Sequence, residues 1–214
     1  MGNRLTASDA SGTIAYQYDS RNRLILETKP DGSTLAYDYD AAGNKVEVVT
    51  PAQISGSAVT LIDTHTYDAL NRLTGITYPA STGENVTYTY DTGTNGVGRL
   101  RSVTDESVTT TYTYDDRGNV LSVSRNTGGE TFVTSYTYDL ADNVASITYP
   151  SGRTVTYSRD ALGRVSGVSS QIPGQASETL ASSVTYEPFG PMATWTSGNG
   201  VANARTFDQD YRVT

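Results

Sequence analysis

The sequence predicts an all-β protein built from tandem antiparallel β-hairpins. Three observations predict it: a motif of aromatic residues and an acidic residue returns nine times, its aromatic residues stand two positions apart, and a turn rich in Gly and Asn follows each copy. Side chains two positions apart lie on one face of a strand, whereas on a helix they would point about 200° apart. We therefore expect strand, turn and strand to alternate along the whole chain.

The acidic residue of each copy defines the repeat. A representative copy is residues 112–120, Tyr-Thr-Tyr-Asp-Asp-Arg-Gly-Asn-Val. Successive acidic residues are 21 to 28 positions apart, about 24 on average, which is typical of repeat architectures. They are Asp19, Asp40, Asp68, Asp91, Asp115, Asp139, Asp160, Glu187 and Asp208. We expect residues 1–214 to form a single array of about nine repeats.

Two aromatic columns precede the acidic residue and predict the incoming strand. The second column, directly before the acid, holds Tyr18, Tyr39, Tyr67, Tyr90, Tyr114, Tyr138, Arg159, Tyr186 and Phe207. The first column, two positions earlier, holds Tyr16, Tyr37, His65, Tyr88, Tyr112, Tyr136, Tyr157, Val184 and Arg205. Tyr and the Thr that often separates the two columns both favour strands. Cross-strand Tyr pairs contribute about 0.2–1 kcal/mol each beyond an Ala pair.

The acidic residue begins a turn that the residue three positions later closes. That later column holds Asn22, Gly43, Asn71, Gly118, Asp142, Gly163 and Gly190, with Gly98 in a copy that carries a four-residue insertion and Tyr211 as the exception. Asp at the first position and Gly or Asn at the fourth are typical of a type I turn closed by a residue with positive φ. We expect the acids to cap these turns rather than to form a cation ladder or general acid–base pairs, which need convergent carboxylates.

An outgoing strand follows each turn. It begins with Leu24, Lys45, Leu73, Leu100, Val120, Val144, Val165, Met192 or Val213, so Lys45 is the exception in an apolar column. Three positions later stand Ile76, Val103, Val123, Ile147, Val168 and Trp195, and we expect Trp195 to pack as Val or Ile does elsewhere. A spacing of three changes face in a regular strand, so either both faces are covered or a β-bulge intervenes. The outgoing strands end at turn clusters 30–32, 79–83, 126–129 and 150–152.

The composition argues against several kinds of function. A net charge of −8 disfavours nucleic acid, and the absence of Cys removes disulfides and thiolate metal sites. The single histidine, His65, lies in the first aromatic column and is interpreted as a substitute for Tyr rather than a ligand or base. Residues 91–96 resemble a calcium loop, yet Ser102 stands where the bidentate Glu is needed. There is neither an apolar run of about 18 residues nor a signal peptide, so we expect no membrane span. Because the acids, His65 and residues 91–96 are each interpreted as structural, we also expect no catalytic residue, no metal and no cofactor.

These motifs resemble the tyrosine-aspartate (YD) repeats of the Rhs family, which includes bacterial Rhs polymorphic toxins, the C components of toxin complexes, and teneurins. The resemblance covers essentially the whole chain, and the variant copy at 186–191 with the following 198–200 is similar to a segment of bacterial members. It implies hairpins that pair edge to edge in a curved, spiralling sheet, which forms part of a hollow shell. The Asp-Pro core motif, at which the toxins cleave themselves, is absent from this sequence.

The resemblance also implies a function. It is that of a structural shell segment, in a secreted or cell-surface bacterial protein, which encapsulates a C-terminal toxic effector. The partners would be the rest of the same chain, its toxin and secretion-apparatus proteins. Because the sequence begins and ends within a repeat, we expect it to be a piece of a longer chain.

Two other functions stay open from the sequence. An adhesion or glycan-binding scaffold would bind through exterior insertions such as 51–62 and 171–182, or stack sugars on its tyrosines. A carbohydrate-active enzyme would need converging carboxylates, which the repeat spacing does not predict. Because the tyrosines recur in every unit rather than at one site, a structural role is favoured.

Overall fold

The computed structural model describes residues 2–54, 57–78, 82–188 and 190–214, and in these residues the chain is all β. Eighteen strands and one short 3-10 helix are found in this described part, and the strands pair antiparallel with their sequence neighbours. The predicted fold class, an array of antiparallel hairpins, is confirmed. No helix in the described residues is long and apolar enough to cross a membrane.

The chain divides into two compact units. The first comprises residues 1–91 and 98–109, and the second residues 92–97 and 110–214. The first contains β1 (Thr6–Asp9), β2 (Gly12–Tyr18), β3 (Leu24–Thr28), β4 (Thr34–Tyr39), β5 (Lys45–Ile54), β6 (Ser57–Tyr67), β7 (Leu73–Thr77), the 3-10 helix η1 (Thr82–Glu84), β8 (Val86–Tyr90) and β9 (Leu100–Thr104).

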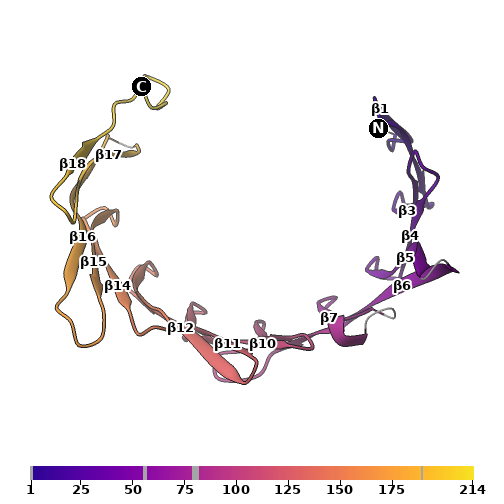
Figure 1. The fold of residues 1–214 in the computed structure, drawn as a ribbon, viewed down its shortest axis with the longest axis horizontal. Helices are drawn as coiled ribbons and strands as arrows, with labels where there is room; N and C mark the ends of the chain where they lie inside the picture. Colours follow the sequence, from indigo (N-terminus) through magenta and orange to yellow (C-terminus); the bar gives the residue numbers. More distant parts are fainter. Residues whose placement is uncertain (1, 55–56, 79–81, 189) are drawn as a thin grey trace. The chain divides into compact units, whose positions relative to one another are not determined.

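The second unit contains most of β10 (Val108–Tyr114), followed by β11 (Val120–Thr127), β12 (Glu130–Tyr138), β13 (Val144–Thr148), β14 (Thr154–Arg159), β15 (Val165–Gln171), β16 (Glu178–Tyr186), β17 (Met192–Ser197) and β18 (Ala202–Ala204). Figure 1 shows the strands of each unit as one layer, with short turns between successive strands.

A β-bulge at the same position of each repeat explains the spacing of the apolar columns. Tyr18 pairs with Leu24 and Gln17 pairs with Leu26, so the residue between the two leucines has no partner of its own. The same shift leaves an extra residue at Val46, Thr74, Arg101, Ala145, Ser166 and Ala193. The sequence left open whether both faces are covered or a β-bulge intervenes, and the structure shows the β-bulge.

The bulge places the aromatic and apolar columns on one face of the sheet. Because one extra residue restores the alternation, the residue three positions into the outgoing strand pairs with the first aromatic column, as Tyr88 does with Val103. We call this side, which carries both aromatic columns and the apolar columns of the outgoing strands, the aromatic face. The residues between the two aromatic columns, mostly Thr, lie on the opposite, polar face.

Almost no side chain is buried, although the chain has 214 residues. In the described residues the buried side chains are those of Ala193, which is 8 % exposed, and Ser170, which is 1 % exposed. The solvent-accessible surface is 13641 Å², against about 9,600 Å² for a compact monomer of this mass. The aromatic face is half-buried and the polar face exposed. Stability must therefore come from contacts between neighbouring hairpins rather than from one core.

The far ends of the hairpins differ in length. Turns form where predicted at 30–32 and 150–152, where the Lys29 N–H donates to the Ser33 carbonyl and the Tyr149 N–H to the Arg153 carbonyl, each at 2.8 Å. At 126–129 the predicted cluster is too wide, because 126 and 127 belong to β11 and only the two glycines form the turn. Part of the cluster at 79–83, residues 79–81, lies outside the described residues.

The first insertion, 51–62, is mostly lengthened strand, and the second, 171–182, is half strand and half connection. The ladder between β5 and β6 continues to the pair of Ile54 with Ser57, so residues 51–54 and 57–62 are strand. In 171–182, residue 171 ends β15 and 178–182 belong to β16, which leaves residues 172–177 as the connection.

Candidate functional site

The aspartates of the motif cap the turns that they begin. In the first copy the Asp19 N–H donates to the Arg23 carbonyl at 2.9 Å, and the Asn22 N–H donates to the Asp19 carbonyl at 3.0 Å. The Asp19 carboxylate Oδ1 accepts from the backbone N–H groups of Arg21, at 2.8 Å, and Arg23, at 2.9 Å. The carboxylates that accept two backbone N–H bonds in this way also include those of Asp40, Asp68, Asp115, Asp139, Asp160 and Asp208.

The fourth residue of the turn has positive φ in the eight copies for which the described residues give this angle. The values lie between 59° and 101°, at Asn22, Gly43, Asn71, Gly98, Gly118, Asp142, Gly163 and Tyr211. Tyr211, the exception in the sequence, thus takes the same backbone conformation. The φ of Gly190 involves residue 189, which lies outside the described residues, so the positive φ of this copy stays a prediction, although the Gly190 N–H donates to the Glu187 carbonyl at 3.0 Å as in the other turns. A Cβ on Gly190 would lie 2.7 Å from the Tyr211 ring, and this close approach is what requires glycine.

A second side chain satisfies the other carboxylate oxygen. In six copies Arg or Asn stands four residues after the acid and its side chain donates to Oδ2: Arg23 Nε to Asp19 at 2.7 Å, and Asn44 Nδ2 to Asp40 at 2.8 Å. The same bond is made by Arg72, Asn119, Asn143 and Arg164. The column of Arg and Asn is visible in the sequence, but its role was not predicted.

These bonds keep the carboxylates charged. The backbone bond from Arg23 lowers the pKa of Asp19, and the side-chain bond from Asn44 lowers the pKa of Asp40. The Arg72 guanidinium, together with the Gly98 N–H, lowers the pKa of Asp91 to about 2. A general acid or base needs a pKa near the operating pH, so these groups are suited to holding turns. Within the described ranges, His, Asp and Glu nowhere gather in groups of three that could hold a metal ion.

The hydroxyl groups of the second aromatic column join neighbouring repeats. Tyr39 Oη donates at 2.8 Å to the carbonyl of Leu24, the first residue of the preceding outgoing strand. The ladder between β3 and β4 includes the pair of Leu26 with Ala36 but does not reach Leu24, so the phenol spans strands that have separated. The same bond, at 2.8 to 3.0 Å, runs from Tyr18 to Arg4, Tyr67 to Lys45, Tyr90 to Leu73, Tyr138 to Val120 and Tyr186 to Val165.

We call this bond the tyrosine clasp, and it explains why the second aromatic column holds Tyr in seven copies and Phe in one. A Phe ring would fill the same space but would leave the carbonyl without its donor. Arg159, the exception in the column, makes an equivalent bond, because its Nη2 donates to the Val144 carbonyl at 2.9 Å. Sequence reasoning predicted stacked rings and missed the clasp, whose signal is the preference for Tyr over Phe in this column.

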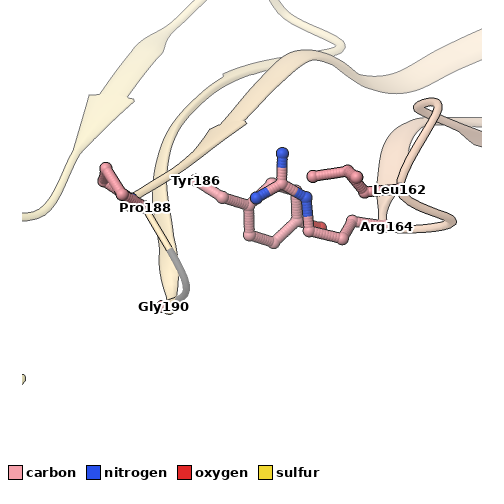
Figure 2. Close-up of a pocket in the computed structure, with 5 residues that line it drawn as sticks. All are labelled: Leu162, Arg164, Tyr186, Pro188 and Gly190. Carbon is pink, nitrogen blue, oxygen red and sulfur yellow. The ribbon is translucent and has the colours of Figure 1, made fainter.

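Cationic side chains cover several of the clasp rings. The guanidinium carbons of Arg23, Arg72 and Arg164 lie 4.5, 4.4 and 4.6 Å from the ring centres of Tyr39, Tyr90 and Tyr186. Figure 2 shows Arg164 against Tyr186, in an open groove of about 510 Å³ that Leu162, Pro188 and Gly190 also line. Such contacts stabilise by about 0.5–1 kcal/mol at exposed sites.

Polar bonds also link several turns to the next. In the first unit, Arg23 Nη1 donates to the Asp40 carbonyl at 3.2 Å, Asn44 Nδ2 donates to Asn71 Oδ1 at 2.8 Å, and Arg72 forms an ion pair with Asp91. In the second unit, Asn119 Nδ2 donates to Asp142 Oδ1 at 2.6 Å. The turns and clasps therefore form a continuous polar ladder within each unit.

The predicted motif residues are distributed along this ladder rather than gathered at one point. The acids and the glycines lie in the turns, the second aromatic column makes the clasps, and the first column lies on the aromatic face. In the described residues no hydroxyl bond is seen for Tyr16, Tyr37, Tyr88, Tyr136 or Tyr157 of the first column, so these contribute their rings. The site is a repeated structural connection.

Each repeat consists of a strand, an acid-capped turn and a bulged strand, and a tyrosine clasps it to the neighbouring repeat. This arrangement defines a tyrosine-aspartate hairpin-repeat protein. The RHS Repeat family model matches residues 2–34, 18–54, 95–131 and 138–170, which together make up more than half of the chain. The chain belongs to the RHS repeat family.

Solved structures with the same fold come from a toxin complex. The chain is similar to a crystal structure of TcdB2-TccC3, with a TM-score of 0.67 and 17 % identity over 97 % of this chain and 13 % of that chain. It is also similar to TcdB2-TccC3 without its hypervariable C-terminal region, with a TM-score of 0.66 and 18 % identity over the same shares of the two chains. At these identities the likeness shows the fold, and the chain spans about one eighth of the length of the structures it matches. Comparison with curated proteins gives no significant match.

Proposed function

We propose that this chain is a wall segment of an Rhs-type toxin, part of a shell that encloses a C-terminal toxic polypeptide until delivery. The observation that supports this most is the single-layered sheet, in which neighbouring repeats are joined by clasps and almost nothing is buried. A protein that acts alone usually buries a core, whereas a wall only has to be continuous. Membership of the RHS repeat family and the shared fold with TcdB2-TccC3 support the same proposal.

The proposed mechanism is steric and entropic. A wall of paired strands leaves no backbone gap for a protease, and a chain confined behind it loses conformational freedom. Its partners would be the remainder of the same, longer polypeptide and the toxic segment, with secretion-apparatus proteins during export. The proposal assigns no catalytic residue and no cofactor to this segment, and it places the protein outside the bacterial cytoplasm or at the cell surface.

The proposal is tested on the natural protein that contains this sequence. Intact-mass analysis and native electrophoresis would ask whether a C-terminal polypeptide stays associated with the repeats until denaturant is added. We expect a trapped segment that resists protease before denaturation and is digested after it. A C-terminal segment that is digested under native conditions would contradict encapsulation.

Deletion of a hairpin end separates this function from adhesion. Removal of residues 172–177, the connection between β15 and β16, should leave the trapped segment protected, because neither the clasps nor the turns are altered. An adhesin that binds through such an end would instead lose cell or glycan binding, with no change in protease protection.

A further inference from the structure

His65 occupies an unusual place on the aromatic face. It stands on β6 in the first aromatic column, where Tyr is found in most copies, and it pairs with Ile76 on β7. The side chain is half-buried, and its Nδ1 atom is buried without a hydrogen-bond partner in the described residues. A buried nitrogen without a partner is costly, and it is more costly when the ring is charged.

The groups around His65 oppose one another in charge. Lys45, at the start of β5, occupies a column that is otherwise apolar, and its Nζ lies 4.6 Å from the centre of the Tyr37 ring on β4. Asp63 lies two residues before His65 on β6, on the same face, and Ile76 on β7 is uncharged. Two departures from the repeat pattern, Lys45 and His65, thus stand on the neighbouring strands β5 and β6, which Figure 1 labels.

Burial and the Lys45 charge both lower the pKa of His65, whereas Asp63 acts in the opposite direction and does not outweigh them. The folded repeat therefore favours the neutral imidazole more than the unfolded chain does. The contribution of His65 to stability is fully present above its ordinary value of 6.5 and is lost as the pH falls from 6.5 toward the lower pKa of the folded state. Protonation in this range charges a ring whose Nδ1 is buried without a hydrogen-bond partner in the described residues, and the positive charge of Lys45 opposes it.

We propose that His65 makes the third repeat an acid-sensitive point of the array, at which proton uptake by the imidazole loosens β6 from β5 and β7. This step is separate from the titration of the turn carboxylates, whose ordinary pKa of 3.8 lies well below it. It therefore operates in mildly acidic solution, where the rest of the ladder is intact. The proposal does not depend on what the array encloses.

Amide hydrogen exchange tests the proposal. Exchange of the β6 amides, corrected for the intrinsic rate, is measured at pH 7.5 and pH 5.5, with β13 in the second unit as the internal reference. We expect the opening equilibrium of β6 to rise by up to about tenfold per pH unit between the two pKa values, with β13 unchanged. His65→Tyr should abolish the rise, and Lys45→Leu, which restores the apolar column, should reduce it.

A direct titration keeps the test decisive if a variant fails to fold. Because His65 is the sole histidine, its ring resonance can be followed by NMR in the folded chain and in urea. A folded pKa below the value in urea supports the proposal. An equal or higher folded pKa, unchanged β6 exchange in the natural sequence, or the same rise in His65→Tyr would overturn it.

Discussion

The hydroxyl group is what makes Tyr rather than Phe suitable for the second aromatic column. The second-column tyrosine supplies a ring to the aromatic face and a hydroxyl to the carbonyl of the preceding repeat, as Tyr39 does to Leu24. The hydroxyl therefore adds a side-chain hydrogen bond to the backbone pairing of β3 with β4 that joins the two repeats. In the described residues no such bond is seen for the first-column residues Tyr16, Tyr37, Tyr88, Tyr136 and Tyr157, so Tyr has a different role in the two columns.

Tyr39→Phe tests the clasp. It removes the hydroxyl and keeps the ring beneath Arg23, so we expect a loss of about 0.5–1.5 kcal/mol in the free energy of unfolding, measured by urea titration. The matched control is Tyr88→Phe in the first column, which should change stability by much less. Equal losses in both variants would show that the hydroxyl bond is not what distinguishes the columns.

Asp115→Ala tests the turn cap, because its neighbour Asp116 provides a control with the same change of charge. Removal of the Asp115 carboxylate leaves the N–H groups of Arg117 and Asn119 without their acceptor, which stood 3.0 and 2.8 Å away. We expect Asp115→Ala to lower the urea midpoint and Asp116→Ala to leave it nearly unchanged. Similar midpoints for the two variants would rule out a capping role.

At the scale of the element, the turn and the bulge together decide which side chains share a face. The turn reverses the chain with one residue of positive φ, and the bulge then shifts the outgoing strand by one residue. Without that shift, the apolar column opposite Tyr88 or Tyr136 would lie on the polar face. The bulge is therefore as much a part of the repeat as the Tyr-Asp pair.

Gly163, with φ of 79°, allows a test of the turn geometry. A Cβ at this position would meet no atom within 4 Å, so any cost of substitution is conformational. Gly163→Asn should be nearly neutral, since Asn22 and Asn71 hold the equivalent place in other copies. Gly163→Val should destabilise by about 1–2 kcal/mol, because a β-branched residue disfavours this conformation. Thermal unfolding of the two variants gives the comparison, and equal effects would contradict the argument.

The sequence predicts the elements well and their cross-connections poorly. Spacing and turn chemistry are local, so the strands, the acid-led turns and the positive φ of Asn22 or Gly43 follow from residues a few positions apart. The clasp joins residues 14 to 22 positions apart, from one hairpin to the next, and depends on where the ladder opens. The bulge could be recognised only as one of two alternatives, because sequence spacing alone does not distinguish it from a covered second face.

At the scale of the whole molecule, the repeated carboxylates predict a response to acid. The pKa values of Asp19, Asp40, Asp68, Asp91, Asp115, Asp139 and Asp160 are lowered from 3.8. Hydrogen bonds cause the net lowering, although at Asp115 and Asp160 partial desolvation, which raises the pKa, is the largest single contribution.

The stability that these carboxylates contribute is present above the ordinary pKa of 3.8 and is lost as the pH falls through the lower values of the folded state, about 2 for Asp91. We expect the urea midpoint to fall steeply between pH 4 and pH 2. A midpoint that does not change over this interval would show that the turn bonds do not favour the charged carboxylates.

The absence of a core also limits what could be predicted for the whole molecule. Hydrophobic periodicity usually indicates which face is covered, and here the aromatic face is only half-buried within the chain itself. Sequence and structure together give the single-layered sheet, its polar ladder and its family.

Electron cryomicroscopy of the natural protein that contains these repeats tests the central claim most directly. We predict that the repeats, each clasped to the next, continue into a closed wall around an internal volume, with one face of this segment turned toward that volume. A map in which the segment is an open sheet with bulk solvent on both faces would contradict the account.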